Sequence, residues 1–452
     1  MKDQSPDFQI VVAELQSDIE KGKLDLALQK FVELSLGDQG YLFTLLDQPS
    51  RDFLLDSLNI DATADLFDRL DDAVTLEAAE NLSTAQLAVV LEEMQPDEAA
   101  DLLGDLPTEL AEQALGEMQE TEDILPLLAY PDETAGGRMT TEFIAMHGET
   151  KTSQAIQQLR NVSPDHEVPY YIFVTDNSER LTGVLGLREL VVSKTNSRIN
   201  QIMDKEVIQV DANLDQEEVA NVMTRHELSA VPVVDQQGIM LGVITHDDIL
   251  DVISEEATED IYLLASVSGM ELEPDSPIPQ QIRGRLPWLY LNALTALFAA
   301  WVVSNFEELI ARVATLAIFL SVVGGLGGNA SSQTVALMVR ALALGKTSPR
   351  KVGSVLAREL LVGAIQGLAI GLIVALGVSQ WQGNPYMGLV VGVAIFINLI
   401  LAGFVGALIP LGLKAFGQDP ALASTVLVTT ITDSVGFLVL LSLAAYFLPR
   451  LI

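Results

Sequence analysis

The sequence of 452 residues contains no cysteine and only four histidines. Without thiols the chain forms no disulfide, holds no thiolate metal site and performs no thiol redox chemistry. The histidines, at positions 147, 166, 226 and 246, are scattered along the chain, which argues against a zinc site. A metal that binds here would meet oxygen ligands, which suit Mg²⁺, Ca²⁺ or Mn²⁺.

Basic residues are also scarce, and they are unevenly placed. The chain has 25 Lys and Arg against 62 Asp and Glu, a net charge of −37. Residues 281–452 contain five acids and ten bases, so this part carries +5 and residues 1–280 carry −42. Such an acidic part repels nucleic acid and attracts cations, although acidity also serves solubility. We therefore expect no nucleic acid partner.

The first residues, MKDQSPDFQI, lack the apolar core of a signal peptide, so we expect the acidic part to stay in the cytoplasm. Within residues 1–130 short helical patterns recur with a period of about twelve, clearest over 82–94, 95–106 and 107–118. Helices of two turns are marginal alone. This acidic domain is therefore predicted to be a superhelical stack of short helices.

A different pattern follows the junction TAGGRMTTEF (134–143). The β-rich runs YYIFVTD (170–176) and AVPVVDQQG (230–238) each precede a second strand and a helix. This tandem α/β unit resembles a pair of CBS domains, at 131–200 and 201–254. Residues 255–280 are predicted to form a charged connecting helix that ends before SPIP (276–279).

Residues 281–452 contain apolar runs long enough to cross a bilayer. We expect five spans, at about 286–304, 310–339, 353–379, 387–413 and 421–448. Basic residues gather before the first span, around the connection between the second and third, and between the fourth and fifth. By the positive-inside rule the N-terminal part lies in the cytoplasm and the C-terminus outside.

One acid, Asp433, lies within the apolar run VTTITDSVGFLVLL (428–441). A charge at mid-bilayer costs about 2.5–3.5 kcal/mol on insertion scales, so a lipid-facing position is disfavoured. Three interpretations remain: a protonated structural Asp, a proton relay, or a cation site in a hydrated path. The hydroxyls of Thr429, Thr430 and Thr432 favour a hydrated lining.

The second expected span holds GGLGGNASSQ (324–333). Its glycines are typical of close helix packing. Asn329 and Gln333, four residues apart, share one helix face, and amides at bilayer depth need polar partners. A second polar face is thus predicted in the membrane part.

These motifs, with the order of the parts, resemble the MgtE magnesium channel family. The resemblance covers nearly the whole chain. It implies a multi-domain α-helical membrane protein with a helical N domain, a CBS pair, a connecting "plug" helix and a five-helix transmembrane domain. It also implies a homodimer in the inner (plasma) membrane with a Mg²⁺ pore on the two-fold axis. Asp433, Asn329 and Thr429 match pore positions, and Gln333 shares the Asn329 face.

The family further implies closure by cytosolic Mg²⁺ bound to acids of the N, CBS and plug regions. The matching positions are Asp97, Asp101, Asp215, Glu217, Glu227, Asp248, Asp251, Glu256, Glu259, Asp260 and Asp419. ATP is an expected modulator, with Tyr170, Arg188, Glu189 and Thr245 as candidate contacts.

Two alternatives stay open. The chain departs from the family motifs at Ser331-Ser332 and at Thr425-Val426, which leaves room for a channel of another divalent cation such as Co²⁺ or Mn²⁺. A membrane-anchored CBS sensor that transports nothing is the second alternative, although an anchor needs no polar midplane. An enzyme is not expected, because the sequence has no nucleophile–base pair and no phosphate loop.

Overall fold

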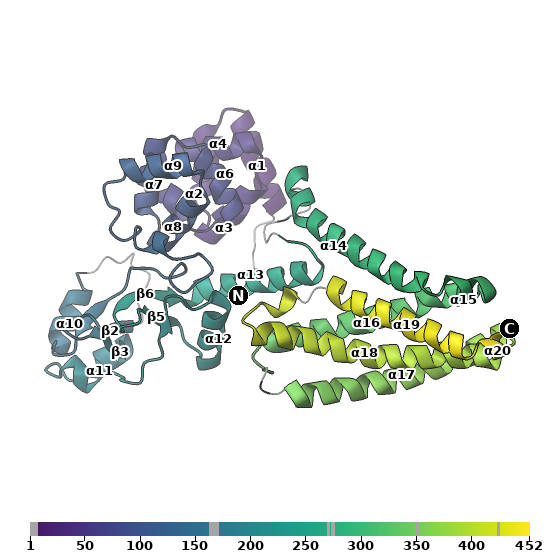
Figure 1. Ribbon diagram of the computed structural model, residues 1–452. Helices are drawn as coiled ribbons and strands as arrows, with labels where there is room; N and C mark the ends of the chain where they lie inside the picture. Colours follow the sequence, from purple (N-terminus) through teal and green to yellow (C-terminus); the bar gives the residue numbers. More distant parts are fainter. Residues whose placement is uncertain are drawn as a thin grey trace. The chain divides into compact units, whose positions relative to one another are not determined.

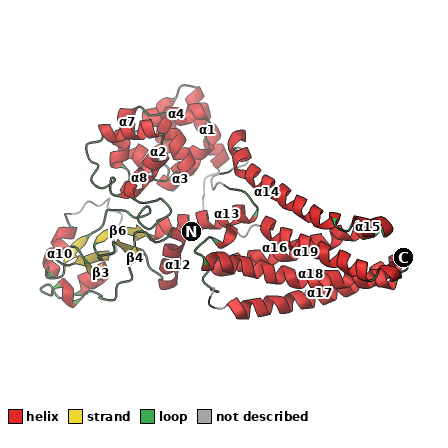
Figure 2. Cartoon of the chain, in the orientation of Figure 1, coloured by secondary structure: helices red, strands yellow, loops and turns green. Residues whose placement is uncertain are grey.

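The structure is a computed structural model that describes residues 8–161, 171–268, 272, 276–348, 350, 352–422 and 425–452. The chain divides into two compact units, Met1–Val252 and Ile253–Ile452. The first unit contains a stack of short helices followed by two small sheets, and the second contains long helices (Figure 1, Figure 2). Each unit is described by itself below.

The first unit opens with α1 (Phe8–Glu20) and continues with eight helices that begin every twelve residues. These are α2 (Leu24–Val32), α3 (Leu36–Leu45), α4 (Gln48–Ser57), α5 (Ile60–Phe67), α6 (Asp72–Glu80), α7 (Thr84–Glu93), α8 (Pro96–Asp105) and α9 (Thr108–Glu117). The repeat that is clearest in the sequence over 82–118 therefore begins much earlier, at residue 24.

The helices of this stack pack against their next-but-one neighbours: α3 on α5, α5 on α7 and α7 on α9, with α4, α6 and α8 in a second row. Side-chain caps recur with the same doubled period of 24 residues. Ser35, Asn59 and Ser83 each accept a hydrogen bond from a backbone N–H in the first turn of an odd-numbered helix. Two-turn helices are thus stabilised by caps and by stacking, and the predicted superhelical stack is confirmed.

Two three-stranded sheets follow the stack and repeat one another. Their strands are β1 (Ala145–His147), β2 (Tyr171–Thr175) and β3 (Leu181–Gly186), then β4 (Val210–Asp211), β5 (Ala230–Val234) and β6 (Met240–Thr245). In each sheet the first strand runs parallel to the second and the third runs antiparallel to it. Both hairpins have the same register, and both shift register just before their last pair. The predicted tandem α/β pair is confirmed.

The helices of the sheet region are α10 (Thr152–Leu159), α11 (Leu187–Val192) and α12 (Gln216–His226), with short 3₁₀ turns at Leu127–Ala129 and Ile199–Gln201. Helix α13 (His246–Leu264) begins directly after β6 and crosses the division between the two units. The domain limit expected at 254/255 therefore falls inside one continuous helix.

The second unit consists of long helices with short connections. They are α14 (Ile278–Ser304), α15 (Glu307–Arg312), α16 (Leu316–Ala343), α17 (Val352–Gln382), α18 (Pro385–Ala415), a 3₁₀ turn (Pro420–Leu422), α19 (Thr425–Tyr446) and α20 (Leu448–Leu451). Among the described residues, α14, α17, α18 and α19 are long and apolar enough to cross a membrane. Helix α16 has the length, but its glycines, hydroxyls and amides lower its apolarity.

The span expected at 310–339 was wrong at its start. Helix α15 ends at Arg312, Val313 has a non-helical backbone (φ −133°, ψ 72°), and α16 begins only at Leu316. Periodicity alone does not reveal this break, because the residues on both sides are apolar and helix-forming.

Helix α18 lies at the centre of the bundle and contacts α16, α17 and α19. Its contact with α17 depends on residues without side chains. A Cβ at Gly363 of α17 would lie 2.6 Å from the carbonyl oxygen of Leu399, and one at Gly371 would lie 2.7 Å from that of Gly392. The two backbones are therefore in direct contact, as is common between membrane helices.

We predict opposite effects for two glycine substitutions in α17. Gly363→Ala should lower the melting temperature of the detergent-solubilised protein, because the methyl meets backbone and typical overpacking costs are about 1–3 kcal/mol. Gly377→Ala is the matched control, since nothing lies within 4 Å of its Cβ position. Thermal unfolding followed by circular dichroism measures both. Equal melting temperatures for the two variants would contradict the described α17–α18 contact.

Candidate ion pathway and acidic clusters

Asp433 lies in the middle of α19, half-buried, with its carboxylate against α16. A Cβ added at Gly324 would come within 2.8 Å of the Asp433 Oδ1 atom and 3.0 Å of the Phe437 ring. The glycine therefore provides the space that the carboxylate occupies. The acid predicted to need partners lies against helix backbone, with part of its surface open.

Thr429, one turn before Asp433, repeats this arrangement one turn along α16. Its Cγ2 atom lies 3.1 Å from the Cβ position of Gly328. The Thr429 hydroxyl donates to the carbonyl oxygen of Thr425, at 2.6 Å. The hydroxyl proton thus stays within α19, and the oxygen keeps lone pairs for a cation or water.

Asn329 and Gln333 lie on α16 and are exposed, as is Gly325 on the same face. This polar stripe adjoins the turns that carry Gly324 and Gly328. The structure thus brings the α16 and α19 motifs to adjacent helices, with the amides on a surface that the chain itself leaves uncovered. At bilayer depth such amides require a polar partner or water.

The two departures from the family motif add no ligand to this pathway. The hydroxyls of Ser331 and Ser332 both donate to the carbonyl oxygen of Gly328, each at 2.9 Å. The hydroxyls of Ser331 and Ser332 are therefore satisfied within α16. At the second departure, the hydroxyl of Thr425 lies 3.4 Å from the carbonyl oxygen of Leu264.

In the described part of the chain, no group of three or more His, Asp or Glu side chains is arranged to hold a metal ion. One chain thus offers a single carboxylate, Asp433, at the membrane site. A membrane site with two acids needs a second copy of the chain.

The end of α13 packs against the same two helices within the second unit. Leu263, 8% exposed, belongs to a cluster with Val335 and Val339 of α16 and Val428 of α19. The Thr425 hydroxyl lies 3.4 Å from the carbonyl oxygen of Leu264. Any movement of α13 therefore acts directly on α16 and α19.

The expected regulatory acids Asp97 and Asp101 lie on α8. Asp97 is buried, whereas Asp101 borders a narrow acidic cleft with α6. Asp72, Glu98, Asp101 and Asp105 line this cleft. Burial raises the pKa of Glu98 to about 9, with further effects of Asp97 and Asp101. Burial also raises the pKa of Asp101 to about 7, against the opposing charge of Arg138, whose Nη1 lies 3.6 Å from Asp101 Oδ2.

Arg138 and Glu98 were not predicted from the sequence. Arg138 belongs to the junction motif, and its Nε also donates to Gln216 of α12, at 2.9 Å. It joins the helical stack to the second α/β domain. The only signal for Glu98 was the run of acids on α8, which does not reveal its burial.

The start of α13 carries Asp248 and Asp251. The Asp248 Oδ2 atom accepts hydrogen bonds from the backbone N–H and the hydroxyl of Thr245, at 3.1 and 2.6 Å. Burial raises the pKa of Asp248 and of Asp251, and Arg138 opposes the shift at Asp251. The charge of Arg138 therefore lowers the pKa of both Asp101 and Asp251, against the effect of burial.

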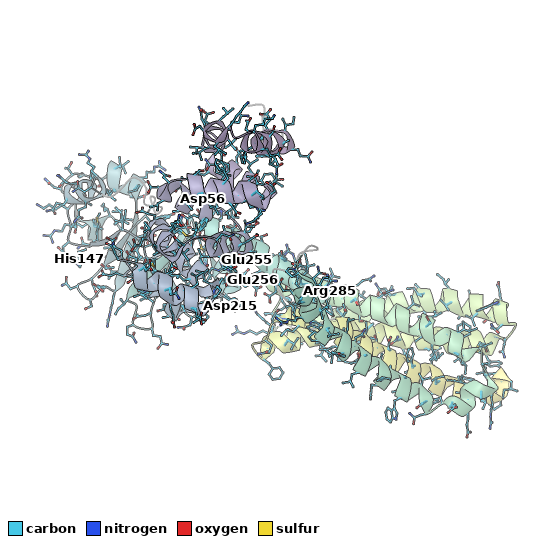
Figure 3. The ribbon with its side chains drawn as sticks, turned by 90° about the horizontal axis from the view of Figure 1, so that it is seen from above. Asp56, His147, Asp215, Glu255, Glu256 and Arg285 are labelled. Atoms are coloured by element: carbon cyan, nitrogen blue, oxygen red, sulfur yellow. The ribbon has the colours of Figure 1, made fainter. Side chains whose placement is uncertain are left out.

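The remaining expected acids are distributed over both units. Asp215 caps α12 by accepting from the Glu217 N–H at 3.0 Å, and Glu227 follows α12 with a left-handed backbone (φ 53°). Glu256, Glu259 and Asp260 are half-buried on α13 (Figure 3 labels Glu255 and Glu256). Asp419 is exposed and accepts from the Ala421 N–H at 2.8 Å.

The four candidate nucleotide contacts differ in their exposure and in the hydrogen bonds they already make. Tyr170 lies outside the described residues. Arg188 and Glu189 are exposed on α11, whereas Thr245 is 8% exposed, and its hydroxyl lies within hydrogen-bond distance of Asp247 and Asp248. The Thr245 hydroxyl is therefore already engaged at the start of α13.

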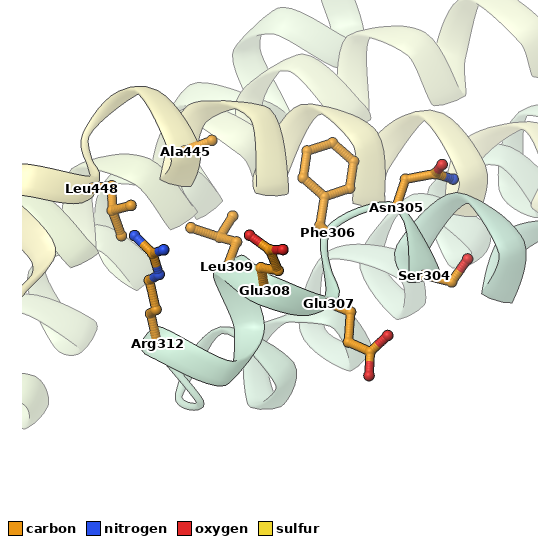
Figure 4. A pocket seen from close by; sticks show the side chains of 9 residues that line it. All are labelled: Ser304, Asn305, Phe306, Glu307, Glu308, Leu309, Arg312, Ala445 and Leu448. Atoms are coloured by element: carbon orange, nitrogen blue, oxygen red, sulfur yellow. The ribbon is translucent and has the colours of Figure 1, made fainter.

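An open cavity of about 480 Å³ lies at the other end of the bundle from the α13 contact, between α15 and the end of α19 (Figure 4). Glu307, Glu308 and Arg312 line it, and all three are exposed. This end of the bundle carries acids, whereas Arg340, Lys346 and Lys414 lie at the α13 end.

The fold and these sites define a membrane-embedded cation transporter joined to an acidic part that contains CBS domains. Family profiles agree. Residues 320–443 match a divalent cation transporter domain named MgtE, residues 34–133 match the MgtE intracellular N domain, and residues 199–255 match a CBS domain.

Individual relatives agree as well. The chain is 34% identical to the magnesium transporter MgtE of Enterococcus faecalis over 92% of this chain and 93% of the relative. It is 37% identical to MgtE of Thermus thermophilus over 71% and 72%, respectively. The crystal structure of the cytosolic domain of the Mg²⁺ channel MgtE in complex with ATP is similar, with a TM-score of 0.51 and 30% identity over 53% of this chain and 99% of that one. The chain belongs to the MgtE family, and the resemblance inferred from its motifs is confirmed.

The acidic cleft predicts a pH dependence of stability. A carboxyl whose folded pKa is about 9 instead of 4.5 binds its proton more tightly in the folded state. The free energy of unfolding therefore falls as pH rises from about 4.5 to about 9. Glu98→Gln should reduce this fall. Thermal unfolding of the full chain in detergent, without divalent cations and at several pH values, measures how steeply the free energy of unfolding falls with pH.

The control for Glu98→Gln is Glu80→Gln, an exposed position on the neighbouring helix α6. This substitution makes the same change of charge, but the free energy of unfolding should fall with pH as steeply as in wild type. Equal slopes for wild type and Glu98→Gln would show that Glu98 is not protonated in the folded protein.

Proposed function

We propose that the chain is a Mg²⁺-selective channel that imports magnesium across the cell membrane as a homodimer with its pore on the two-fold axis. The observation that carries this proposal is the α16–α19 pair. There Asp433 and Thr429 lie over Gly324 and Gly328. The amides of Asn329 and Gln333 are exposed on the adjoining face.

The exposed polar face supports a dimer. Amides and a partly open carboxylate in contact with lipid would each remain without hydrogen bonds, at a cost of several kcal/mol. A two-fold axis beside α16 and α19 places this face against its own copy. It encloses a polar path and brings two Asp433 carboxylates together.

Mg²⁺ fits such a path by its hydration chemistry. It loses water reluctantly and prefers oxygen ligands in octahedral geometry. Two carboxylates with amide and hydroxyl groups hold a hydrated ion by hydrogen bonds to its water, and the dication removes the repulsion between the two acids. Mg²⁺ is here the transported ion.

The position of α13 supports a gate. Its last turn contacts α16 and α19 through Leu263 and Leu264, and its first two turns carry Asp248 and Asp251. Cytosolic Mg²⁺ bound among the acids of the helical stack, the CBS pair and α13 favours the compact, closed state. When Mg²⁺ falls, repulsion between these acids favours the open state.

Orientation follows from the distribution of charge. Arg340, Lys346, Arg358 and Lys414 lie at the α13 end of the bundle, which the positive-inside rule assigns to the cytoplasm. The α15 end, with Glu307 and Glu308, then faces outside together with the C-terminus. ATP bound to the CBS pair is a proposed modulator, with exposed Arg188 and Glu189 as contacts.

Asp433→Ala should reduce Mg²⁺ flux to the background of empty vesicles, because the pathway then has no carboxylate to hold the hydrated ion. Flux is measured with a Mg²⁺-sensitive dye inside liposomes that contain the purified full chain. Glu307→Ala is the matched control, since it removes an exposed acid at the α15 end and should keep wild-type flux.

The same assay separates the alternatives. A wild-type chain that passes Co²⁺ or Mn²⁺ but not Mg²⁺ is a channel for another divalent cation, and one that passes no divalent cation is a sensor. Wild-type Mg²⁺ flux in Asp433→Ala would remove Asp433 from the pathway.

The combined variant Asp248→Asn, Asp251→Asn, Glu256→Gln and Glu259→Gln should keep conducting at millimolar cytosolic Mg²⁺, where wild type closes. Patch recording at stepped internal Mg²⁺ measures the inhibition. A control with the same loss of charge converts the exposed acids Glu33, Asp52, Asp56 and Glu80 to amides and should close as wild type does. Closure of both variants at the same Mg²⁺ would place the gate elsewhere.

A further inference from the structure

Asn398 is a buried amide in the middle of α18, at the centre of the membrane unit. Its exposed fraction is 1%, and its Nδ2 donates to the carbonyl oxygen of Val323 in α16, at 2.9 Å. Its Oδ1 accepts no hydrogen bond from the part of the chain that the structure describes. A leucine would fill this space without burying an amide, so hydrophobic stability alone does not explain the residue.

The amide occupies a slot between two glycines on two different helices. A Cβ at Gly327 of α16 would overlap the Asn398 Nδ2 atom. A Cβ at Gly436 of α19 would lie 2.7 Å from Nδ2 and 2.9 Å from Cγ. The Asn398 side chain therefore contacts α16 and α19 at the same time, and only because both positions lack a side chain.

The slot adjoins the turns that form the candidate pathway. Val323, the hydrogen-bond acceptor, precedes Gly324, against which Asp433 lies. Gly327 precedes Gly328, against which Thr429 lies. Gly436 follows Asp433 by three residues, so it lies about one turn along α19. Asn398 therefore contacts both helices close to the groups that face the ion.

We propose that Asn398 is a positioning residue of the ion pathway. Its hydrogen bond to Val323 fixes α16 against α18, and its place between Gly327 and Gly436 fixes the spacing between α16 and α19. This spacing sets the relation of Asn329 on α16 to Asp433 and Thr429 on α19. Asn398 itself does not touch the ion. The inference rests on the proposed function of the pathway.

The test compares Asn398→Leu, which keeps the number and branching of the side-chain heavy atoms and removes the hydrogen bond, with wild type in the liposome assay. Because the site is then less well positioned, the half-saturating Mg²⁺ concentration should rise about threefold, the effect of one interhelical hydrogen bond in a membrane. The ratio of Mg²⁺ to Mn²⁺ flux should fall. Maximal flux per folded protein should change less than either quantity.

Two further variants test the slot. Gly327→Ala should also raise the half-saturating Mg²⁺ concentration, because the added methyl displaces the Asn398 amide. In the double variant Gly327→Ala with Asn398→Ala the methyl has room, but the hydrogen bond to Val323 is still absent. The half-saturating Mg²⁺ concentration should therefore equal that of Asn398→Ala alone and should not show the sum of the two single effects. Gly377→Ala, whose Cβ position has no neighbour within 4 Å, is the control for the added methyl.

The matched control for Asn398 is Asn384→Leu on the same helix. Asn384 caps the start of α18 by accepting from the Tyr386 N–H at 2.9 Å, so its loss should lower the amount of folded protein without altering half-saturation or the flux ratio. If Asn398→Leu behaves like Asn384→Leu, or like wild type, while Asp433→Ala abolishes flux, the positioning role is wrong and the pathway stands. If wild type carries no divalent cation, both are wrong.

Discussion

The close approach of α16 and α19 is the constraint on which the membrane unit depends. Gly324 and Gly328 allow Asp433 and Thr429 to lie against the α16 backbone, and every other feature of the pathway follows from this contact. It sets the carboxylate beside the turns that carry the exposed amides of Asn329 and Gln333. The face of α16 that carries Asn329 and Gln333 stays uncovered by the chain itself, because α16 packs on α19 through its glycine face. A carboxylate within this apolar helix is then compatible with folding because helix backbone and hydroxyls replace part of the lipid around it.

The acidic part of the chain holds several carboxyl groups close together in a partly buried cleft. Glu98 and Asp101 are buried enough that their pKa values rise to about 9 and about 7, so the folded state resists their ionisation. Arg138, between Asp101 and Gln216, is an internal cation that offsets part of this repulsion. Helix α13 then joins the two units mechanically, since its first turn belongs to the acidic unit and its last turn packs on α16 and α19.

The comparison with relatives covers both units of the chain. The similarity to magnesium transporters named MgtE extends over more than nine-tenths of the chain. Where this chain departs from the family motif, at Ser331-Ser332, the hydroxyls return to the Gly328 carbonyl oxygen and do not enter the pathway.

Composition and periodicity alone determined much about this protein. The separation of charge along the chain predicted an acidic part and a membrane part, and the twelve-residue period predicted the helical stack. The lone acid Asp433 and the spacing of Asn329 and Gln333 marked the two pathway helices, because these signals are local. Tertiary structure decided what depends on residues far apart in the chain. The burial of Glu98, the reach of Arg138 to Gln216 and the slot of Asn398 between Gly327 and Gly436 arise only when distant segments pack together. An amide in an apolar run or an acid in an acidic helix has the same local pattern whether it is buried or exposed, so its role depends on its neighbours in space.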